Sequence, residues 1–112
     1  MKGLEAHLID AVEKAIQDPS PTCLGISAIC EYGRSDPEVT MLTDTAGRTI
    51  LSAIARRISE AKADGDVSKD INVGEAAAFI NATLAGIKLS ARAGASPESL
   101  RGIARMALRS LR

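Results

Sequence analysis

The chain has 112 residues, of which 46% are apolar and 25% are charged, and its 14 basic residues balance its 14 acidic ones. This length fits one domain, and the composition excludes a disordered chain. A net charge of zero argues against nucleic-acid binding by this chain alone, because binding phosphates needs a basic surplus on one face. The sequence has no apolar run long enough to span a membrane and does not begin like a signal peptide, so we expect no membrane partner.

The first two predicted helices occupy residues 3–17 and 22–32. In the first, apolar residues recur every three or four positions, which is typical of a helix with one buried face. The prolines of the Asp-Pro-Ser-Pro stretch at 18–21 end it, since proline cannot continue a helix. Gly33 is a suitable residue to end the second helix.

A long third helix is predicted over residues 37–63. Ser35 or Asp36 would cap its first turn, in which Pro37 fits well, and Glu38 completes a Ser-x-x-Glu capping box. The polar stretch at 64–70 then reads as a loop.

The fourth predicted helix covers residues 73–93, is capped by Asn72, and is apolar on two sides. Its first apolar face consists of Ala77, Ile80, Leu84, Ile87 and Ala91. Its second apolar face consists of Phe79, Ala82, Gly86 and Leu89. Only a narrow edge with Asn81, Lys88 and Arg92 is polar. A helix that is apolar on two sides must be covered on two sides.

The fifth predicted helix begins at Ser96, Pro97 and Glu98 and carries one apolar seam. Pairing two copies of the last two helices about a two-fold axis would form a four-helix bundle that buries both seams. The alternative is that the seams meet inside one chain, but the doubly apolar fourth helix favours a homodimer. The predicted dimer interface consists of Ala77, Ile80, Leu84, Ile87, Leu100, Ala104, Ala107 and Leu111.

A small-ligand pocket is a second possibility, formed by the second, third and fourth predicted helices. These helices bring together mostly apolar side chains with a few hydroxyl groups, which is the usual composition of such a pocket. The same residues are equally compatible with a plain core, and spacing alone leaves both interpretations open. The candidate ligand-binding residues are Cys23, Ile26, Ser27, Cys30, Thr43, Phe79 and Thr83.

No catalytic, metal or cofactor site is predicted. Cys23 and Cys30 are about 10 Å apart if they lie on one helix, which is too far for a disulfide, so we expect buried, reduced thiols in a cytoplasmic protein. The single histidine, His7, lies on another predicted helix, and the sequence has no Cys-x-x-Cys pair. No pair of carboxylates stands out as an acid and base couple, so the chain is not predicted to be an enzyme.

Two stretches resemble the C-terminal half of TetR-type transcriptional regulators. They are "DPSPTCLGISAICEYGRSDPEVTML", at residues 18–42, and "ADGDVSKDINVGEAAAFINATLAGIKLSARAGASPESLRGIARMAL", at residues 63–108. The similarity extends over nearly the whole chain, although "TCLG" replaces the more usual Arg-Gly-Cys-Leu. The helix-turn-helix segment with which this family reads operator DNA has no counterpart in the sequence.

The resemblance implies an all-α domain, spanning residues 1–112, that binds an effector and dimerises. By resemblance, the second to fourth helices line the effector pocket and the last two form the dimer bundle. We therefore expect five helices, a homodimer, a small apolar effector and no cofactor, in the regulatory part of a repressor. Contact with operator DNA would require the missing helix-turn-helix domain. The alternative is a stand-alone helical dimerisation or interaction module without ligand or DNA binding.

Overall fold

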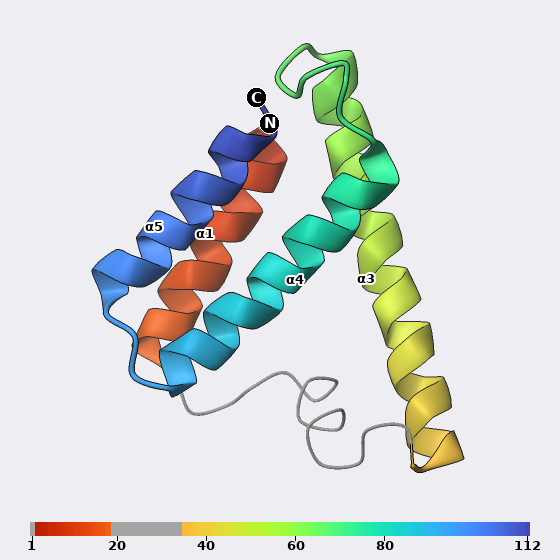
Figure 1. Ribbon diagram of the computed structural model, residues 1–112, viewed down its shortest axis with the longest axis vertical. Helices are drawn as coiled ribbons and strands as arrows, with labels where there is room; N and C mark the ends of the chain where they lie inside the picture. The colour runs from red at the N-terminus through yellow and green to blue at the C-terminus, as the bar shows by residue number, and fades with distance from the viewer. Residues whose placement is uncertain (1, 19–34) are drawn as a thin grey trace.

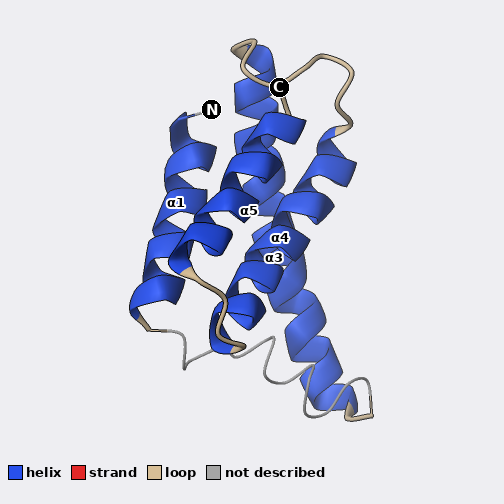
Figure 2. Cartoon of the chain, turned by 60° about the vertical axis from the view of Figure 1, so that its left-hand side comes forward, coloured by secondary structure: helices blue, strands red, loops and turns tan. Residues whose placement is uncertain are grey.

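The computed structural model describes residues 2–18 and 35–112, and the regular structure within these residues is entirely helical. The four helices are α1 (Lys2–Gln17), α3 (Pro37–Ala63), α4 (Val73–Arg92) and α5 (Pro97–Ser110). Figures 1 and 2 show α1, α4 and α5 running alongside one another, α3 crossing α4, and two chain ends that lie close together. The all-α prediction is thus confirmed for the described residues, and the predicted helix at 22–32 lies outside them. No described helix is both long enough and apolar enough to cross a bilayer.

Local capping explains why the predicted helix bounds agree with the structure to within one residue. Asn72 Oδ1 accepts a hydrogen bond from the backbone N–H of Glu75 at 2.9 Å. Ser96 Oγ likewise accepts from Ser99 N–H at 3.1 Å. Each bond satisfies one of the N–H groups that have no partner inside the helix. At the other end of α4, Gly94 has a φ of 96°, a conformation that glycine adopts without strain.

The helices form a flat arrangement in which α4 is the central element. Helix α1 packs along both α4 and α5, whereas α3 packs mainly against α4. The contact made by α3 involves its C-terminal half, where Ile54 and Ile58 are buried. Its N-terminal half diverges from the other helices, and Met41 and Leu42 are exposed there.

The core is built around an apolar stripe that runs the length of α1. The stripe consists of Leu4, Leu8, Val12 and Ala15, all of which are buried. Its first two residues pack in a cluster with residues of α3, α4 and α5, and its last two pack with α4 and α5 only. Helix α1 therefore covers the inner faces of both later helices along their whole shared length.

Hydrogen bonds of the loop between α3 and α4 connect it to α3 and to the C-terminal end of the chain. The Ser68 N–H donates to the carbonyl of Leu111 at 2.9 Å, and Lys62 Nζ donates to the carbonyl of Ile71 at 2.6 Å. At the same end of the molecule, Arg57 Nη1 of α3 donates to the carbonyl of Gly3 in α1 at 2.9 Å. These bonds fix how α1, α3 and α5 meet at the end of the bundle that holds the termini.

Candidate functional site

The residues predicted to form the dimer interface are buried inside the single chain. Every one of them is less than a tenth exposed, and each belongs to one of the two core clusters. They are Ala77, Ile80, Leu84, Ile87, Leu100, Ala104, Ala107 and Leu111. Within the single chain these side chains present almost no surface, and their assignment to a dimer interface stays a prediction.

These side chains are buried because α1 packs against them. The seams of α4 and α5 do pair, as predicted, but the stripe of α1 fills the groove between them within one protomer. Ile80 and Ile87 are completely buried in this way. Within one protomer the seams thus meet, which is the alternative weighed from the sequence.

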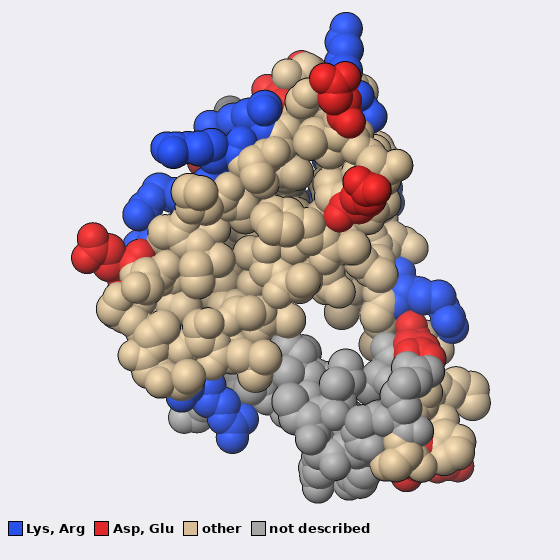
Figure 3. Space-filling model, viewed as in Figure 1, with Lys and Arg blue, Asp and Glu red and all other residues tan. Residues whose placement is uncertain are grey.

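The second apolar face of α4 is the one that remains exposed. Phe79 is 44% exposed, and on the neighbouring helix α5 Ile103 is 36% and Met106 63% exposed. Together they line a shallow groove of about 760 Å³ on the side of the molecule away from α1. We call this surface the outer face, and it consists of Phe79, Thr83, Ser99, Gly102, Ile103, Met106, Ala107 and Ser110. Figure 3 shows a continuous area without charged side chains over α4 and α5.

Phe79 and Thr83, predicted as ligand-binding residues between the second, third and fourth helices, lie on this outer face. They line the groove with residues of α5, and no residue of α3 contributes to it. The hydroxyl of Thr83 donates to the carbonyl of Phe79 at 2.8 Å, a bond within the same helix. The helix turns these two residues toward α5, and their placement in a pocket with the second predicted helix, which lies outside the described residues, stays a prediction.

The other candidate ligand-binding residues lie outside the described part of the structure. Cys23, Ile26, Ser27 and Cys30 all fall within residues 19–34, and the side chain of Thr43 is not described either. Their role in a pocket stays a prediction.

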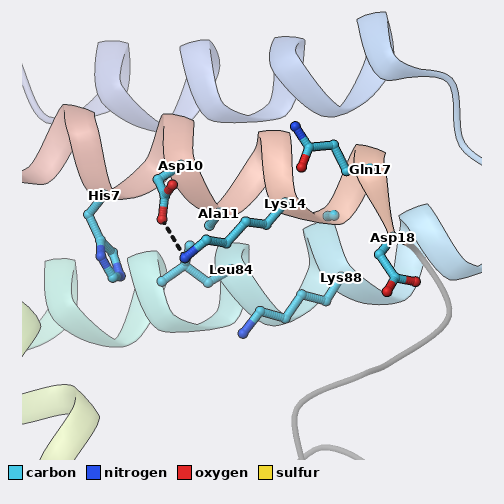
Figure 4. A pocket seen from close by; sticks show the side chains of 9 residues that line it. His7, Asp10, Ala11, Lys14, Gln17, Asp18, Leu84 and Lys88 are labelled. Atoms are coloured by element: carbon cyan, nitrogen blue, oxygen red, sulfur yellow. Dashed lines mark ion pairs between the residues drawn. The ribbon is translucent and has the colours of Figure 1, made fainter.

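A second pocket, of about 450 Å³, lies between α1 and α4, on the side of α4 opposite the outer face. We call it the α1–α4 pocket, and it is lined by His7, Asp10, Ala11, Lys14, Ala15, Gln17, Asp18, Leu84 and Lys88. Figure 4 shows the polar side chains of α1 around the opening and Leu84 on the floor. This volume falls within the range of small-molecule sites.

Sequence reasoning missed this pocket because its residues were interpreted one at a time. The sequence singles out His7 only as the one histidine, and Lys88 only as part of the narrow polar edge of α4. The sequence does contain an indication of this pocket. A pocket with both polar and apolar lining needs a wall such as α4, on which a polar edge adjoins an apolar face. What the sequence does not show is that this edge faces α1.

Ion pairs stabilise the contacts that α1 makes at the surface. Within the pocket, Lys14 Nζ lies 3.0 Å from Asp10 Oδ2. Outside it, Arg101 of α5 donates two hydrogen bonds to the carboxylate of Glu13, at 2.9 and 3.2 Å. This bond and the positive charge of Arg101 lower the pKa of Glu13. The Glu13 carboxylate raises the pKa of Arg101 in turn.

Chemistry beyond binding has little support in the described residues. Across residues 2–18 and 35–112, no polar or charged side chain is buried, and no group of His, Cys, Asp and Glu residues is placed to hold a metal ion. Among the described residues, the groove of the outer face and the α1–α4 pocket are two places where another molecule can bind.

The family of tetracyclin repressor-like C-terminal domains matches residues 3–107 of the chain. The match includes α1, α3, α4 and most of α5. Such domains belong to transcriptional regulators. Neither a curated protein nor a solved structure matches the chain.

Proposed function

Because this chain belongs to the family of tetracyclin repressor-like C-terminal domains, we propose that it is the regulatory domain of a transcriptional repressor. In this role it binds a small effector and pairs with a second copy of itself. The operator is read by a helix-turn-helix domain outside the matched residues. The observation that carries the proposal is the exposed apolar outer face, on the same two helices that the family resemblance assigns to dimerisation.

The outer face has the properties of a surface that another protein covers. Phe79, Ile103 and Met106 are large apolar side chains with more than a third of their area exposed. They adjoin one another on α4 and α5, and no charged residue lines the groove between them. Single exposed apolar residues are ordinary on a protein surface, but a contiguous patch marks an interaction site.

Two copies of this hairpin form a four-helix bundle when their outer faces meet. The surface is self-complementary in the way that a two-fold interface requires, because bulky Phe79 and Met106 alternate with small residues such as Gly102. Small residues let helices approach closely, and the large residues fill the space that remains. The net charge of zero adds no repulsion between the copies.

The effector half of the proposal rests on the α1–α4 pocket. It lies across α4 from the outer face, so one helix forms a wall of both sites. A ligand that changes how α1 packs on α4 therefore changes the position of the helix that carries the interface. This is the physical requirement for coupling a small molecule to the arrangement of two protomers.

Sedimentation of two matched variants tests the dimer. Met106→Asp buries an unpaired carboxylate if the outer faces meet, so we expect a monomer with unchanged helix content. Met41→Asp is the control, because Met41 on α3 is 64% exposed, against 63% for Met106, and lies away from the outer face. We expect this variant to remain a dimer. A dimer that survives Met106→Asp would remove the outer face from the proposal.

The variant Leu84→Asp separates a lost interface from a lost fold. Leu84 lies in the core formed by α1, α3, α4 and α5, so a carboxylate there destabilises the protomer itself. Loss of the circular dichroism signal of the helices is expected for Leu84→Asp and not for Met106→Asp. If the protein dimerises but binds no small molecule, the alternative function, a stand-alone interaction module, is supported.

A further inference from the structure

The α1–α4 pocket is lined by two lysines and two aspartates, and one of the lysines, Lys88, is unpaired among the described residues. Lys14 is paired with Asp10, and the distance between their charged atoms is 3.0 Å. Lys88, on α4, has no hydrogen bond or ion pair with any residue in the described part of the chain, although its side chain is half-buried. A cation that is partly removed from water and unpaired favours an anion beside it.

The lysine side chains extend toward the same end of the pocket. In Figure 4, Lys14 from α1 reaches Leu84, and Lys88 runs along α4 in the direction of Leu84. Asp18 also lines the pocket, but at its other end, and Lys88 points away from it. The one carboxylate at the centre, that of Asp10, is matched by Lys14, so the charge of Lys88 is left over.

The floor beneath these charges is apolar and narrow. Ala11, Ala15 and Leu84 line it; Ala11 is partly exposed, whereas Ala15 and Leu84 are each only 7% exposed and contribute little more than their edges. An apolar floor with a cation above it fits a molecule that has an apolar body and one negatively charged end. A purely apolar effector, the sequence-based expectation, would leave Lys88 partly desolvated and without a partner.

From this arrangement we propose that the effector is a small organic carboxylate. This inference rests on the proposed effector-binding function and specifies its ligand class. The carboxylate lies between the ammonium groups of Lys88 and Lys14, and the apolar body lies on Ala11, Ala15 and Leu84. Lys88 provides the attraction that a neutral analogue lacks, because the charge of Lys14 is already shared with Asp10.

Calorimetry and thermal melting with matched probes test this class. The acids are hexanoate, benzoate and phenylacetate. The comparison compounds are the corresponding neutral amides and primary amines, all at one fixed ionic strength so that screening does not differ between them. We expect the acids to bind and to raise the melting temperature, and the amides to bind at least about tenfold more weakly, since a hydrogen bond to a charged group contributes more than a neutral one.

A pair of lysine variants assigns the effect to the pocket. Lys88→Gln keeps a polar N–H donor on a side chain one bond shorter and removes its charge, so the preference for acids over amides should fall about tenfold. Lys69→Gln is the control, because Lys69 is an exposed lysine in the loop between α3 and α4 and does not line the pocket. We expect it to bind the acids like the unaltered protein.

The outcomes separate the ligand class from the function itself. Acids that bind the unaltered protein, and lose affinity in Lys88→Gln alone, support the inference. The carboxylate assignment is overturned if amides or amines bind as tightly as the acids. It is also overturned if the acids bind Lys88→Gln as tightly as the unaltered protein. Either result leaves effector binding in place. If no compound of any of the three classes binds, effector binding at this pocket is overturned together with the assignment.

Discussion

Glu13 of α1 and Arg101 of α5 form an ion pair with two hydrogen bonds. In the described residues, no other pair of side chains joins α1 and α5 by two hydrogen bonds. The two bonds between Glu13 and Arg101 measure 2.9 and 3.2 Å, and both side chains are about half exposed. The arrangement is bidentate, which fixes geometry better than a single bond does. Water nevertheless screens an exposed pair, so its effect on stability is small and depends on salt.

The lowered pKa of Glu13 gives this pair a defined pH dependence. A carboxyl group with a lower pKa in the folded protein adds stability above its unfolded pKa and loses it as the pH falls through the folded value. We expect Glu13→Gln to lower the melting temperature slightly at neutral pH, and the difference from the unaltered protein to shrink below about pH 4.3, the ordinary value for glutamate. A difference that grows as the pH falls would contradict this account.

The cap of α4 is a second prediction at the scale of single residues. Asn72→Ala removes the oxygen that accepts from Glu75 N–H and should lower the free energy of unfolding by about 1 kcal/mol. Asn81→Ala is the control in the same helix, because Asn81 lies in its interior and alanine is the best helix former. Urea denaturation of both variants measures the difference, and equal stabilities would show that the cap bond contributes nothing.

At the scale of the helix, α4 shows what a sequence pattern can and cannot establish. Its caps and bounds are local, since Asn72 and Gly94 act on their own turns, and the sequence predicts them correctly. The two apolar faces also follow from the spacing of residues such as Ile80 and Phe79. Which face meets which partner depends on contacts with distant segments, and periodicity contains no information about them.

The same limit applies to the candidate site. Both apolar faces of α4 must be buried against another element. The apolar stripe of α1 can bury one of them, but the residue spacing in α4 does not indicate which face that is. The structure pairs α1 with the face of Ile80 and leaves Phe79 exposed. The spacing therefore predicts the two apolar faces of α4 but not the partner of each face.

Gly86 allows a prediction about the exposed face of α4. It lies in the helix interior, and a Cβ added there has nothing within 4 Å in the protomer. Gly86→Leu should therefore stabilise the isolated protomer by up to about 1 kcal/mol, because glycine is a poor helix former. It should also weaken the dimer, because a large side chain keeps the two copies of α4 apart. Urea denaturation in a Met106→Asp background measures the first effect, and sedimentation of the single variant measures the second.

Gly47→Leu is the matched control for this variant. Gly47 lies in the interior of α3, and a Cβ there likewise has nothing within 4 Å. We expect a similar gain in protomer stability and no change in association. If both leucine variants dimerise like the unaltered protein, Gly86 is not part of the interface.

The flat shape of the whole molecule leaves an apolar surface that a second copy can cover. The principal extents are 42, 32 and 17 Å, so the shortest is less than two helix diameters of about 10 Å each. Helices α1 and α3 cover α4, but they leave the side of α4 and α5 that carries the outer face uncovered. Phe79, Ile103 and Met106 face outward for that reason, and adding a second layer is what completes the core.

If a second copy provides that layer, thermal stability must depend on protein concentration. A folded dimer that unfolds to two separate chains gains about 2.7 kcal/mol for each hundredfold rise in concentration, by mass action. We expect the melting temperature of the unaltered protein to rise by several degrees over such a range in calorimetry. The melting temperature of Met106→Asp should stay constant, because a monomer unfolds without a change in the number of molecules. A constant value for the unaltered protein would mean that the outer face stays uncovered in solution, and pairing could then play no part in how the domain responds to a ligand.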